Sequence, residues 1–171
     1  VVTGGTGGIG AAIAEGLARA GLRVIIVGRS AAAGQALAHR LSQAFDTEVS
    51  FEQADLSSRQ EVQKLSDRIS ASRQPIDVLV NNAAGVFEQR RTSVDGIEYT
   101  LALNHLGPLL MTLRLEPLLR RSPQARVIQM AADPGLLAGQ PPDPDDLQMQ
   151  RGYSGIKAYM RSKNLNVITA Y

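Results

Sequence analysis

The chain opens with Val1-Val2-Thr3-Gly4-Gly5-Thr6-Gly7-Gly8-Ile9-Gly10, and the fold prediction starts from this segment. β-Branched residues precede a glycine-rich run and an alanine-rich segment comes after it, so the order predicted is strand, tight turn, helix. Gly4, Gly8 and Gly10 fall where a turn, a close approach to phosphate and close helix-to-sheet packing each exclude a Cβ atom. Helix N-termini bind anions through free N–H groups and the helix dipole. Glycine-rich runs also occur in ordinary loops, so the phosphate-loop hypothesis depends on support from the rest of the sequence.

Apolar residues beyond this loop alternate between helical and extended spacing. Helices are predicted at 9–20, at 31–45 and from a cap at 55–58 to about 70. A further segment, 94–121, is predicted to be mostly helical with a break or bend at Pro108 and a second irregularity at Pro117, and a last helix runs from about 153 to the end. Strands are predicted at 22–27, 49–53, 126–130 and from 75 to an end at Asn81-Asn82. The Pro- and Asp-rich residues 139–146 are expected to form a surface loop. This alternation indicates right-handed βαβ units and a parallel sheet.

The size of the chain, 171 residues with 44% hydrophobic content, suits one domain with a sizeable core. No apolar run has the length of a membrane span, so none is predicted. The chain begins inside an expected strand and ends inside an expected helix. We therefore expect 1–171 to be a single domain truncated at both ends, whose sheet leaves apolar surface exposed.

Charge and composition exclude several function classes. The 18 basic and 16 acidic residues are scattered and nearly balance at +2, and aromatic residues make up only 4%, so nucleic acid is not an expected partner. The absence of cysteine removes disulfides, thiolate catalysis and zinc–thiolate sites, and it fits a reducing compartment such as the cytoplasm. The two histidines, His39 and His105, are interpreted as structural. No metal site is predicted.

The opening motif resembles the TGxxxGxG motif of the short-chain dehydrogenase/reductase family, with Thr3-Gly4, Gly8 and Gly10 at the matching spacing. It differs from the usual dinucleotide fingerprint and from a P-loop, which needs Gly-Lys-Ser/Thr. The resemblance extends over nearly the whole chain and implies a Rossmann-like, doubly wound α/β fold. It also implies that the opening loop contacts the cofactor through Gly4, Thr6, Gly7, Gly8, Ile9 and Gly10.

The end of the second strand bears on the choice of cofactor. In dinucleotide-binding folds an acidic residue there binds the ribose 2′-hydroxyl, whereas a nearby Arg accommodates a 2′-phosphate. Here Gly28 takes the acidic position and Arg29 comes next. A guanidinium matches phosphate in shape and charge, so NADP(H) is predicted in preference to NAD(H). The alternative is that Arg29 is only a solvated residue at the strand end.

Two further segments resemble cofactor-binding positions of the family. Asp55-Leu56 matches the pair that contacts the adenine, although an Asp there also serves as a helix cap. Asn81-Asn82-Ala83-Ala84-Gly85 resembles the family's Asn-Asn-Ala-Gly turn, which implies cofactor contacts from Asn82, Ala83 and Ala84. Ala84 stands where the family has glycine, so a shifted backbone is expected there.

The strongest chemical signal is Tyr159 and Lys163, four residues apart and therefore on one face of the last predicted helix. An ammonium beside a phenol lowers the phenol pKa from about 10 toward the range that acid–base catalysis needs. Tyr153 and Lys157 have the same spacing. The later pair is favoured because Ser162 precedes the lysine, as in the family's Tyr-xx-Ser-Lys helix.

The resemblance also narrows the branch. Asn104 matches the family asparagine that holds a water for the proton relay to the lysine. The surrounding Asn104-His105-Leu106-Gly107 and Asp95-Gly96-Ile97-Glu98 look like the retinol-dehydrogenase and WW-domain-oxidoreductase branch. The catalytic set implied is Tyr159, Lys163 and Asn104.

One departure from the family lies after the fifth predicted strand. The family usually has two serines there, the second of which donates to the substrate carbonyl, but this chain has Ala131-Ala132-Asp133. The loss of one such donor slows related chemistry about a hundred- to a thousandfold. Asp133 or a loop residue could substitute, the substrate could be polarised differently, or turnover could be poor.

The sequence therefore predicts an NADP(H)-dependent oxidoreductase acting on a small carbonyl or alcohol substrate. The alternative is an NADP(H)-binding regulatory or scaffold protein with little turnover, because one fold hosts many functions. Joint retention of Asn104, Tyr159 and Lys163 favours the enzyme. Since family members often pair through their long helices, a homodimer is also compatible with the resemblance.

Overall fold

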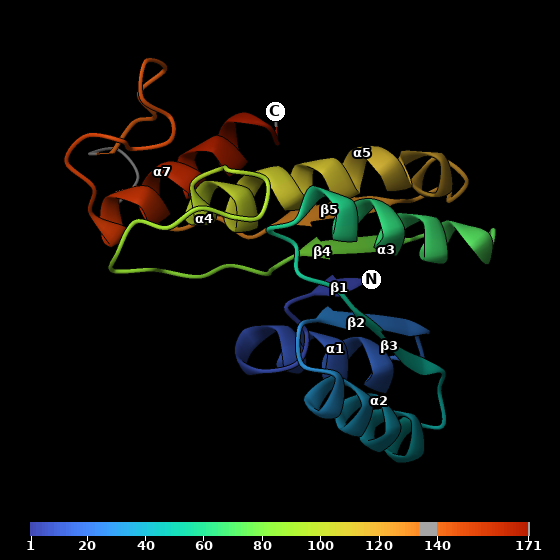
Figure 1. Ribbon diagram of the computed structural model, residues 1–171. Helices are drawn as coiled ribbons and strands as arrows, with labels where there is room; N and C mark the ends of the chain where they lie inside the picture. Colours follow the sequence, from blue (N-terminus) through green and yellow to red (C-terminus); the bar gives the residue numbers. More distant parts are fainter. Residues whose placement is uncertain (134–139, 171) are drawn as a thin grey trace.

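The computed structural model describes residues 1–133 and 140–170, whose centre is a five-stranded, all-parallel sheet (Figure 1). The strand order is β3-β2-β1-β4-β5. The strands are β1 (Val2–Thr3), β2 (Val24–Gly28), β3 (Val49–Gln53), β4 (Val78–Asn81) and β5 (Arg126–Gln129). The order reverses between β1 and β4, and ligands of open α/β sheets bind at such a switch point, beyond the carboxyl ends of the strands.

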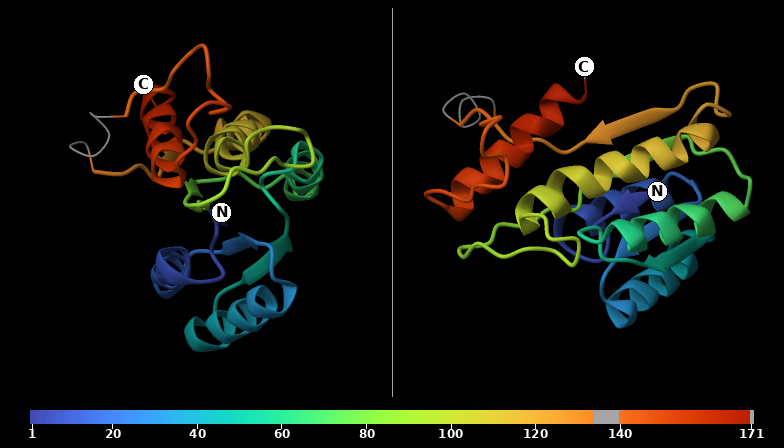
Figure 2. Two further views of the ribbon diagram at one scale, coloured as in Figure 1. Left: turned by 60° about the vertical axis from the view of Figure 1, so that its left-hand side comes forward. Right: turned by 45° about the horizontal axis from the view of Figure 1, so that its top comes forward.

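Helices cover both faces of the sheet (Figures 1 and 2). On one face lie α1 (Gly8–Arg19) and α2 (Ala31–Phe45). On the other lie α3 (Arg59–Ala71), α4 (Tyr99–Leu101), the π-helix η1 (Ala102–Leu106), α5 (Gly107–Leu119) and α7 (Gly155–Ile168). The predicted doubly wound α/β fold is therefore confirmed.

Two apolar layers hold the helices to the sheet. One layer, between the sheet and α1 and α2, is built around the fully buried Val2, Ile26 and Leu41. The other, beneath α3 and α5, includes Leu65, Leu79, Met111 and Leu115. Since β2 contributes Val24 and Ile26 to the first layer and Val27 to the second, its apolar run is continuous rather than alternating.

The outer strand β5 is less covered than the rest of the sheet. Val127 and Ile128 are 45% and 44% exposed, although both are large apolar residues in a strand. The expected exposure of apolar sheet surface is therefore present at this strand.

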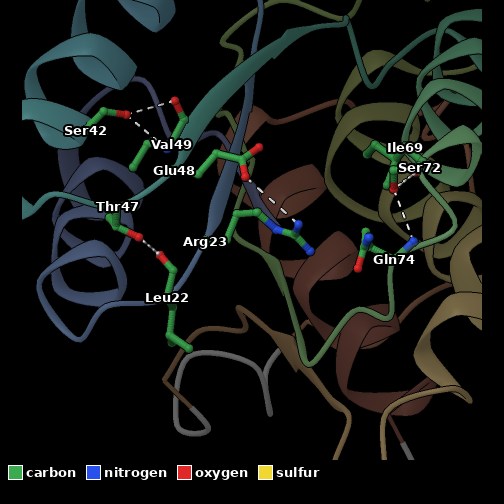
Figure 3. A network of polar contacts seen from close by, with 9 residues as sticks. All are labelled: Leu22, Arg23, Ser42, Thr47, Glu48, Val49, Ile69, Ser72 and Gln74. Carbon is green, nitrogen blue, oxygen red and sulfur yellow. Dashed lines mark hydrogen bonds and ion pairs between the residues drawn. The ribbon is translucent and has the colours of Figure 1, made fainter.

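The amino ends of the strands carry polar contacts that tie loops together, seen in Figure 3. Ser42 Oγ bonds both the N–H and the carbonyl of Val49, and Thr47 Oγ1 donates to the carbonyl of Leu22 at 3.3 Å. A hollow of about 300 Å³ lies at this end, beside Val1. It faces away from the carboxyl ends, where the predicted site residues gather.

The segment 94–121 differs from its prediction. Residues 94–98 are not helical, because Gly96 has φ +75° in a turn and Thr92 pairs with Glu98 in an antiparallel bridge. The helix begins at Tyr99, where the Glu98 carboxylate accepts from the N–H groups of the two residues after Tyr99. Pro108 does not break the helix, since it lies in the first turn of α5 and the irregularity is the π-helical turn just before it. Pro117 lies inside α5, two residues before its end, and does not end it.

Smaller boundary differences have local causes. β2 begins at Val24 rather than Leu22, because the Leu22 N–H still bonds to the Leu17 carbonyl at the end of α1. α7 begins at Gly155 and ends at Ile168, rather than running from Tyr153 to the last residue. Of the predicted surface loop, residue 139 lies outside the described residues, and 140–146 contain no helix or strand.

Candidate functional site

The opening loop takes a shape that side chains would prevent. Gly4 has φ +63°, and a Cβ there would meet the Ala83 Cα at 2.8 Å. A Cβ on Gly10 would lie 2.2 Å from the Gly4 carbonyl oxygen and 2.5 Å from Asn82 Nδ2. The first turn of α1 therefore packs directly on the turn that precedes it, as only glycine allows.

Hydrogen bonds to the β4 end fix this loop. Thr3 Oγ1 donates to the Val80 carbonyl and accepts from the N–H groups of Asn82 and Ala83, at 2.9 and 3.1 Å. Asn82 Nδ2 in turn donates to the Thr3 carbonyl at 2.9 Å. The two strands that flank the switch point are thus tied together at their carboxyl ends.

The start of α1 has the properties of an anion site. Its N-cap residue is Gly7, which makes no side-chain cap hydrogen bond. A Cβ at Gly7 or Gly8 would meet nothing within 4 Å, and Ile9 is 65% exposed. Because Gly7 has no side chain, no N-cap side chain accepts from the N–H groups of the first turn. Open space lies around this turn, as phosphate binding requires.

The Thr6 side chain occupies the space that a side chain at position 28 would need. A Cβ on Gly28 would lie 2.6 Å from Thr6 Cγ2, so the place of the family's acidic residue is filled by the opening loop. Arg29 comes next and is exposed. Its Nη1 donates to the Tyr99 hydroxyl at 3.4 Å, and that hydroxyl donates to Asp55 Oδ2 at 3.3 Å.

Two adjoining pockets lie along this edge. A pocket of about 140 Å³ is lined by ten residues, namely Gly4, Thr6, Val27, Gly28, Arg29, Ala54, Leu56, Ala83, Ala84 and Leu103. A wider pocket of about 430 Å³ shares Arg29 and Ala54 with it and adds Lys64 and Arg68. Most residues that line the narrower pocket are aliphatic or glycine. The wider pocket carries three cationic side chains and also the carboxylates of Asp55 and Glu61.

Asp55 does not cap α3, contrary to its alternative interpretation. Ser58 is the N-cap, and its side chain accepts from the Glu61 N–H. Asp55 Oδ1 instead accepts from the N–H and the hydroxyl of Ser57, at 2.9 and 2.8 Å. Leu56 is buried and lines the narrower pocket.

Ala84 is not among the residues with positive φ, so alanine is accepted there without backbone strain. The backbone shift relative to the family's turn stays a prediction. At Gly85, a Cβ would meet the Phe87 ring at 2.6 Å. Both the N–H and the carbonyl of Gly85 bond the Asn104 side chain, at 2.9 and 3.0 Å.

Tyr159 and Lys163 lie one turn apart on α7. The Lys163 side chain is only 2% exposed, and its Nζ lies 5.5 Å from the centroid of the Tyr159 ring. Nζ donates to the Met130 carbonyl, just beyond β5, at 2.7 Å. Burial lowers the pKa of the Lys163 ammonium from its ordinary 10.5 to about 8, because desolvation disfavours the charged form.

The rival pair is arranged differently. Lys157 is exposed, and the Tyr153 hydroxyl donates to the Phe87 carbonyl at 2.9 Å. A Cβ at Gly155 would also collide with the Phe87 carbonyl, so this part of α7 packs on the loop after β4. The contacts of Tyr153 are those of a structural anchor.

Asn104 is 1% exposed and lies in η1. Besides its bonds to Gly85, its Nδ2 donates to Ser162 Oγ at 3.1 Å, and Ser162 Oγ donates to the Tyr159 carbonyl at 2.6 Å. Asn104 is thus linked through Ser162 to the main chain of Tyr159, whereas the Lys163 amine bonds the Met130 carbonyl instead. The catalytic roles of these residues and the water of the relay stay predictions.

Ala132 lies after β5 in the position of the family's second serine and is half-buried. Its methyl group cannot donate a hydrogen bond. Asp133, the candidate substitute, is exposed and has an interaction partner. Residues 134–139, which could also supply a substitute, lie outside the described part of the chain.

Two residues of this site have contacts that the sequence does not predict. Thr3 belongs to the opening motif, but its hydroxyl also makes three of the hydrogen bonds that fix the loop. Tyr99 carries no sequence signal, because its contacts with Arg29 and Asp55 span 70 and 44 residues. Its ring also packs edge-on against Phe87 and beneath the Arg91 guanidinium, which explains its fixed position.

Within residues 1–133 and 140–170, His, Asp and Glu side chains form no group of three that could hold a metal ion. Each described helix is too short or too polar to cross a membrane.

Comparison with known proteins places this arrangement in a family. A family model described as short chain dehydrogenase matches residues 1–141. Human polyprenol dehydrogenase is 34% identical, in an alignment that covers 100% of this chain and 53% of that protein. Retinol dehydrogenase 12 of Mus musculus is 31% identical, with coverages of 98% and 53%.

A solved structure adds a likeness in three dimensions. The RhlG/NADP active-site complex of Pseudomonas aeruginosa has a TM-score of 0.73 at 35% identity, covering 96% of this chain and 60% of that one. The chain spans about half the length of the two curated dehydrogenases that it matches. Because the family model covers most of the sequence, from the opening loop past β5, the chain belongs to the short chain dehydrogenase family.

Proposed function

We propose that this chain binds NADP(H) and supports hydride transfer between the nicotinamide and a carbonyl or alcohol carbon. The observation that carries the proposal is the buried Lys163 amine one turn from Tyr159, held by the carbonyl just after β5. All strands are parallel, so this pair lies along the same sheet edge as the opening loop. A dinucleotide bound along that edge would contact both the opening loop and the Tyr159–Lys163 pair.

The residues present fit the diphosphate part of such a cofactor. The start of α1 has a glycine N-cap and open space before its first-turn N–H groups, which suits a pyrophosphate. The pocket shared by Gly28 and Leu56 suits the adenosine. These contacts are common to NAD(H) and NADP(H).

Arg29 supports the choice of NADP(H). Its guanidinium borders both pockets, and the carboxylate that would bind a 2′-hydroxyl is replaced by Gly28 and the packed Thr6 side chain. The similar RhlG structure is an NADP complex. A 2′-phosphate would pair with Arg29 in a charge-assisted contact, which a 2′-hydroxyl cannot match.

The chemistry divides between cofactor and protein. NADPH, when bound, supplies the hydride that reduces a carbonyl carbon. The Tyr159 hydroxyl gives its proton to the carbonyl oxygen, and the Lys163 ammonium stabilises the phenolate that remains. For alcohol oxidation the phenolate accepts the proton instead. Lys163 has a second role, because its Nζ can donate to ribose hydroxyls.

A second candidate function, cofactor binding with little turnover, is favoured by Ala132 alone. Without the serine hydroxyl, the substrate carbonyl has one fewer donor near Tyr159. The missing donor slows the reaction but does not remove the proton transfer, so the enzyme is the better-supported function.

The test measures NADPH binding by fluorescence and NADPH consumption with a panel of aldehydes and ketones. The enzyme predicts consumption that Tyr159→Phe abolishes without weakening NADPH binding. Ala132→Ser is expected to raise the rate, by up to about a hundredfold. Binding without consumption, in both the unaltered protein and Ala132→Ser, would support the alternative function.

A further inference from the structure

Two buried side chains near the catalytic pair have no role in the proposed hydride transfer. They are Asn166 of α7, 2% exposed, and His105 of η1, 5% exposed. Asn166 Nδ2 donates to the main-chain carbonyl of Asn104 at 3.0 Å, and Asn166 Oδ1 lies 2.9 Å from His105 Nδ1. Buried polar groups are costly unless they are paired, so these contacts need an explanation.

Pro108 explains why the Asn104 carbonyl is open to a side chain. In an α-helix that carbonyl would accept from the N–H of residue 108, but proline has no N–H. The chain instead forms the π-helical turn η1 before Pro108. The amide of Asn166 donates to this carbonyl in place of the N–H that Pro108 lacks.

This bond also determines the tautomer of His105. A carbonyl only accepts, so the Asn166 atom that faces Asn104 must be the amide nitrogen. Asn166 then presents its oxygen to the imidazole, and His105 Nδ1 must carry a hydrogen. Each of the three groups has one defined orientation, which fixes how η1 meets α7.

The contacts are placed to set the position of the catalytic helix. Ser162 and Asn166 are one turn apart on α7, and both bind Asn104, one through its side chain and the other through its carbonyl. Lys163 lies between them, and the Tyr159 carbonyl accepts from Ser162. Asn104 is itself bonded to Gly85 in the loop after β4.

We propose that Asn166, supported by His105, is a positioning residue for the reaction. This inference rests on the proposed function. The Asn166 bridge prevents α7 from sliding or rotating on η1, and so holds the Tyr159 hydroxyl and the Lys163 amine at a set distance from the loop that borders the cofactor. Asn166 itself does not contact substrate or cofactor.

The test uses the substitution Asn166→Asp in the whole protein. The carboxylate has the same shape and still accepts from His105, but it cannot donate to the Asn104 carbonyl. A misplacement of about 1 Å can cost about a hundredfold in rate, so kcat per NADPH-binding site is expected to fall about ten- to a hundredfold. The Kd for NADPH is expected to stay within about threefold.

Two comparisons separate positioning from general damage. Asn164→Asp makes the same chemical change two residues away, where the amide donates to the Gln140 carbonyl rather than to η1, and it should keep kcat near the unaltered value. His105→Gln keeps an N–H for Asn166 and should retain more kcat per site than His105→Leu. If Asn166→Asp does not fold, kcat per site is compared between His105→Gln and His105→Leu instead.

The possible failures are distinguishable. If the unaltered protein consumes no NADPH with any carbonyl tested, the proposed function falls and this inference with it. If the unaltered protein turns over and Asn166→Asp loses thermal stability while keeping its kcat per site, the network is only structural. That second result would overturn the positioning role alone.

Discussion

The opening loop and the junction between η1 and α7 are built in opposite ways. The loop depends on side chains being absent, since a Cβ at Gly10 would lie 2.2 Å from the Gly4 carbonyl. The junction depends on side chains being present, because Asn104 bonds Ser162 across 58 residues of sequence and Asn166 across 62. The loop is a local backbone device, whereas the junction is a long-range network of amides.

These opposite constructions determine which substitutions each region tolerates. The close contacts of the loop tolerate no added atom, and few polar side chains take part, chiefly Thr3 and Asn82 at the tie to β4. A network of buried amides tolerates little change in chemistry, because each lost partner leaves another group unpaired. The two regions should therefore fail differently, in cofactor binding and in the rate of the chemical step.

The largest effect is expected for Gly10→Ala in the loop. The added methyl group collides with the Gly4 carbonyl, and overpacking of this kind costs about 1–3 kcal/mol or more. Because the collision displaces the turn itself, NADPH should bind about a hundredfold more weakly. Fluorescence titration and thermal unfolding measure the two losses.

Gly16→Ala is the matched control in the same helix. A Cβ there meets nothing within 4 Å. Alanine should raise the free energy of unfolding by about 0.5–1 kcal/mol, because glycine is the poorer helix former. Equal damage from both substitutions would remove the steric account of the loop.

The substitution Arg29→Ala should weaken the binding of NADPH much more than the binding of NADH. Loss of a charged hydrogen-bonding partner costs about 1.5–3 kcal/mol, so the Kd for NADPH should rise about ten- to a hundredfold. The Kd for NADH should change little. Arg23→Ala, at the amino end of β2, is the control, and equal weakening of both cofactors by Arg29→Ala would contradict the 2′-phosphate assignment.

Lys163 offers a test by titration. Its pKa in the folded protein is lowered to about 8, so NMR of labelled lysine without cofactor should find one amine titrating there, absent in Lys163→Arg. Between about pH 8 and 10.5 the unfolded chain binds the extra proton, so this group makes the fold more stable as pH rises through that window. A Lys163 pKa near 10.5 would show that the amine is not buried.

His105 should give the smallest effect. Burial lowers its pKa below the ordinary 6.5, with the Asn166 bond opposing that shift. The unfolded chain then binds more protons below pH 6.5, and stability is lost as pH falls through that range. His105→Gln should show a shallower loss in unfolding experiments between pH 7 and 5. Identical pH dependence in both proteins would contradict the neutral, buried imidazole.

The sequence predicted the loop and the sheet well, because their signals are local. The spacing of Gly4, Gly8 and Gly10 and the apolar run of β2 are short-range patterns, and the neighbouring residues support their interpretation. The predicted bounds of α2, Ala31–Phe45, agree with the structure for the same reason. The sheet order is constrained once the crossovers are right-handed.

The junction could not be predicted in the same way. Pro108 indicated a break, but whether a proline bends a helix or comes after a π-helical turn depends on donors elsewhere in the fold. Here the donor is Asn166, whose polar side chain on a helix face looks like any other. Tyr99 illustrates the same limit, since its partners come from the ends of β2 and β3.

A single-turnover experiment tests hydride transfer and the role of Tyr159 together. Enzyme loaded with one equivalent of NADPH is mixed with a carbonyl panel, and the absorbance of the reduced nicotinamide is followed. We predict that at least one carbonyl consumes the bound NADPH, and that Tyr159→Phe binds NADPH equally well but reacts at least about a hundredfold more slowly. Bound NADPH that persists with every carbonyl, or that Tyr159→Phe consumes at the same rate, would contradict the proposed function.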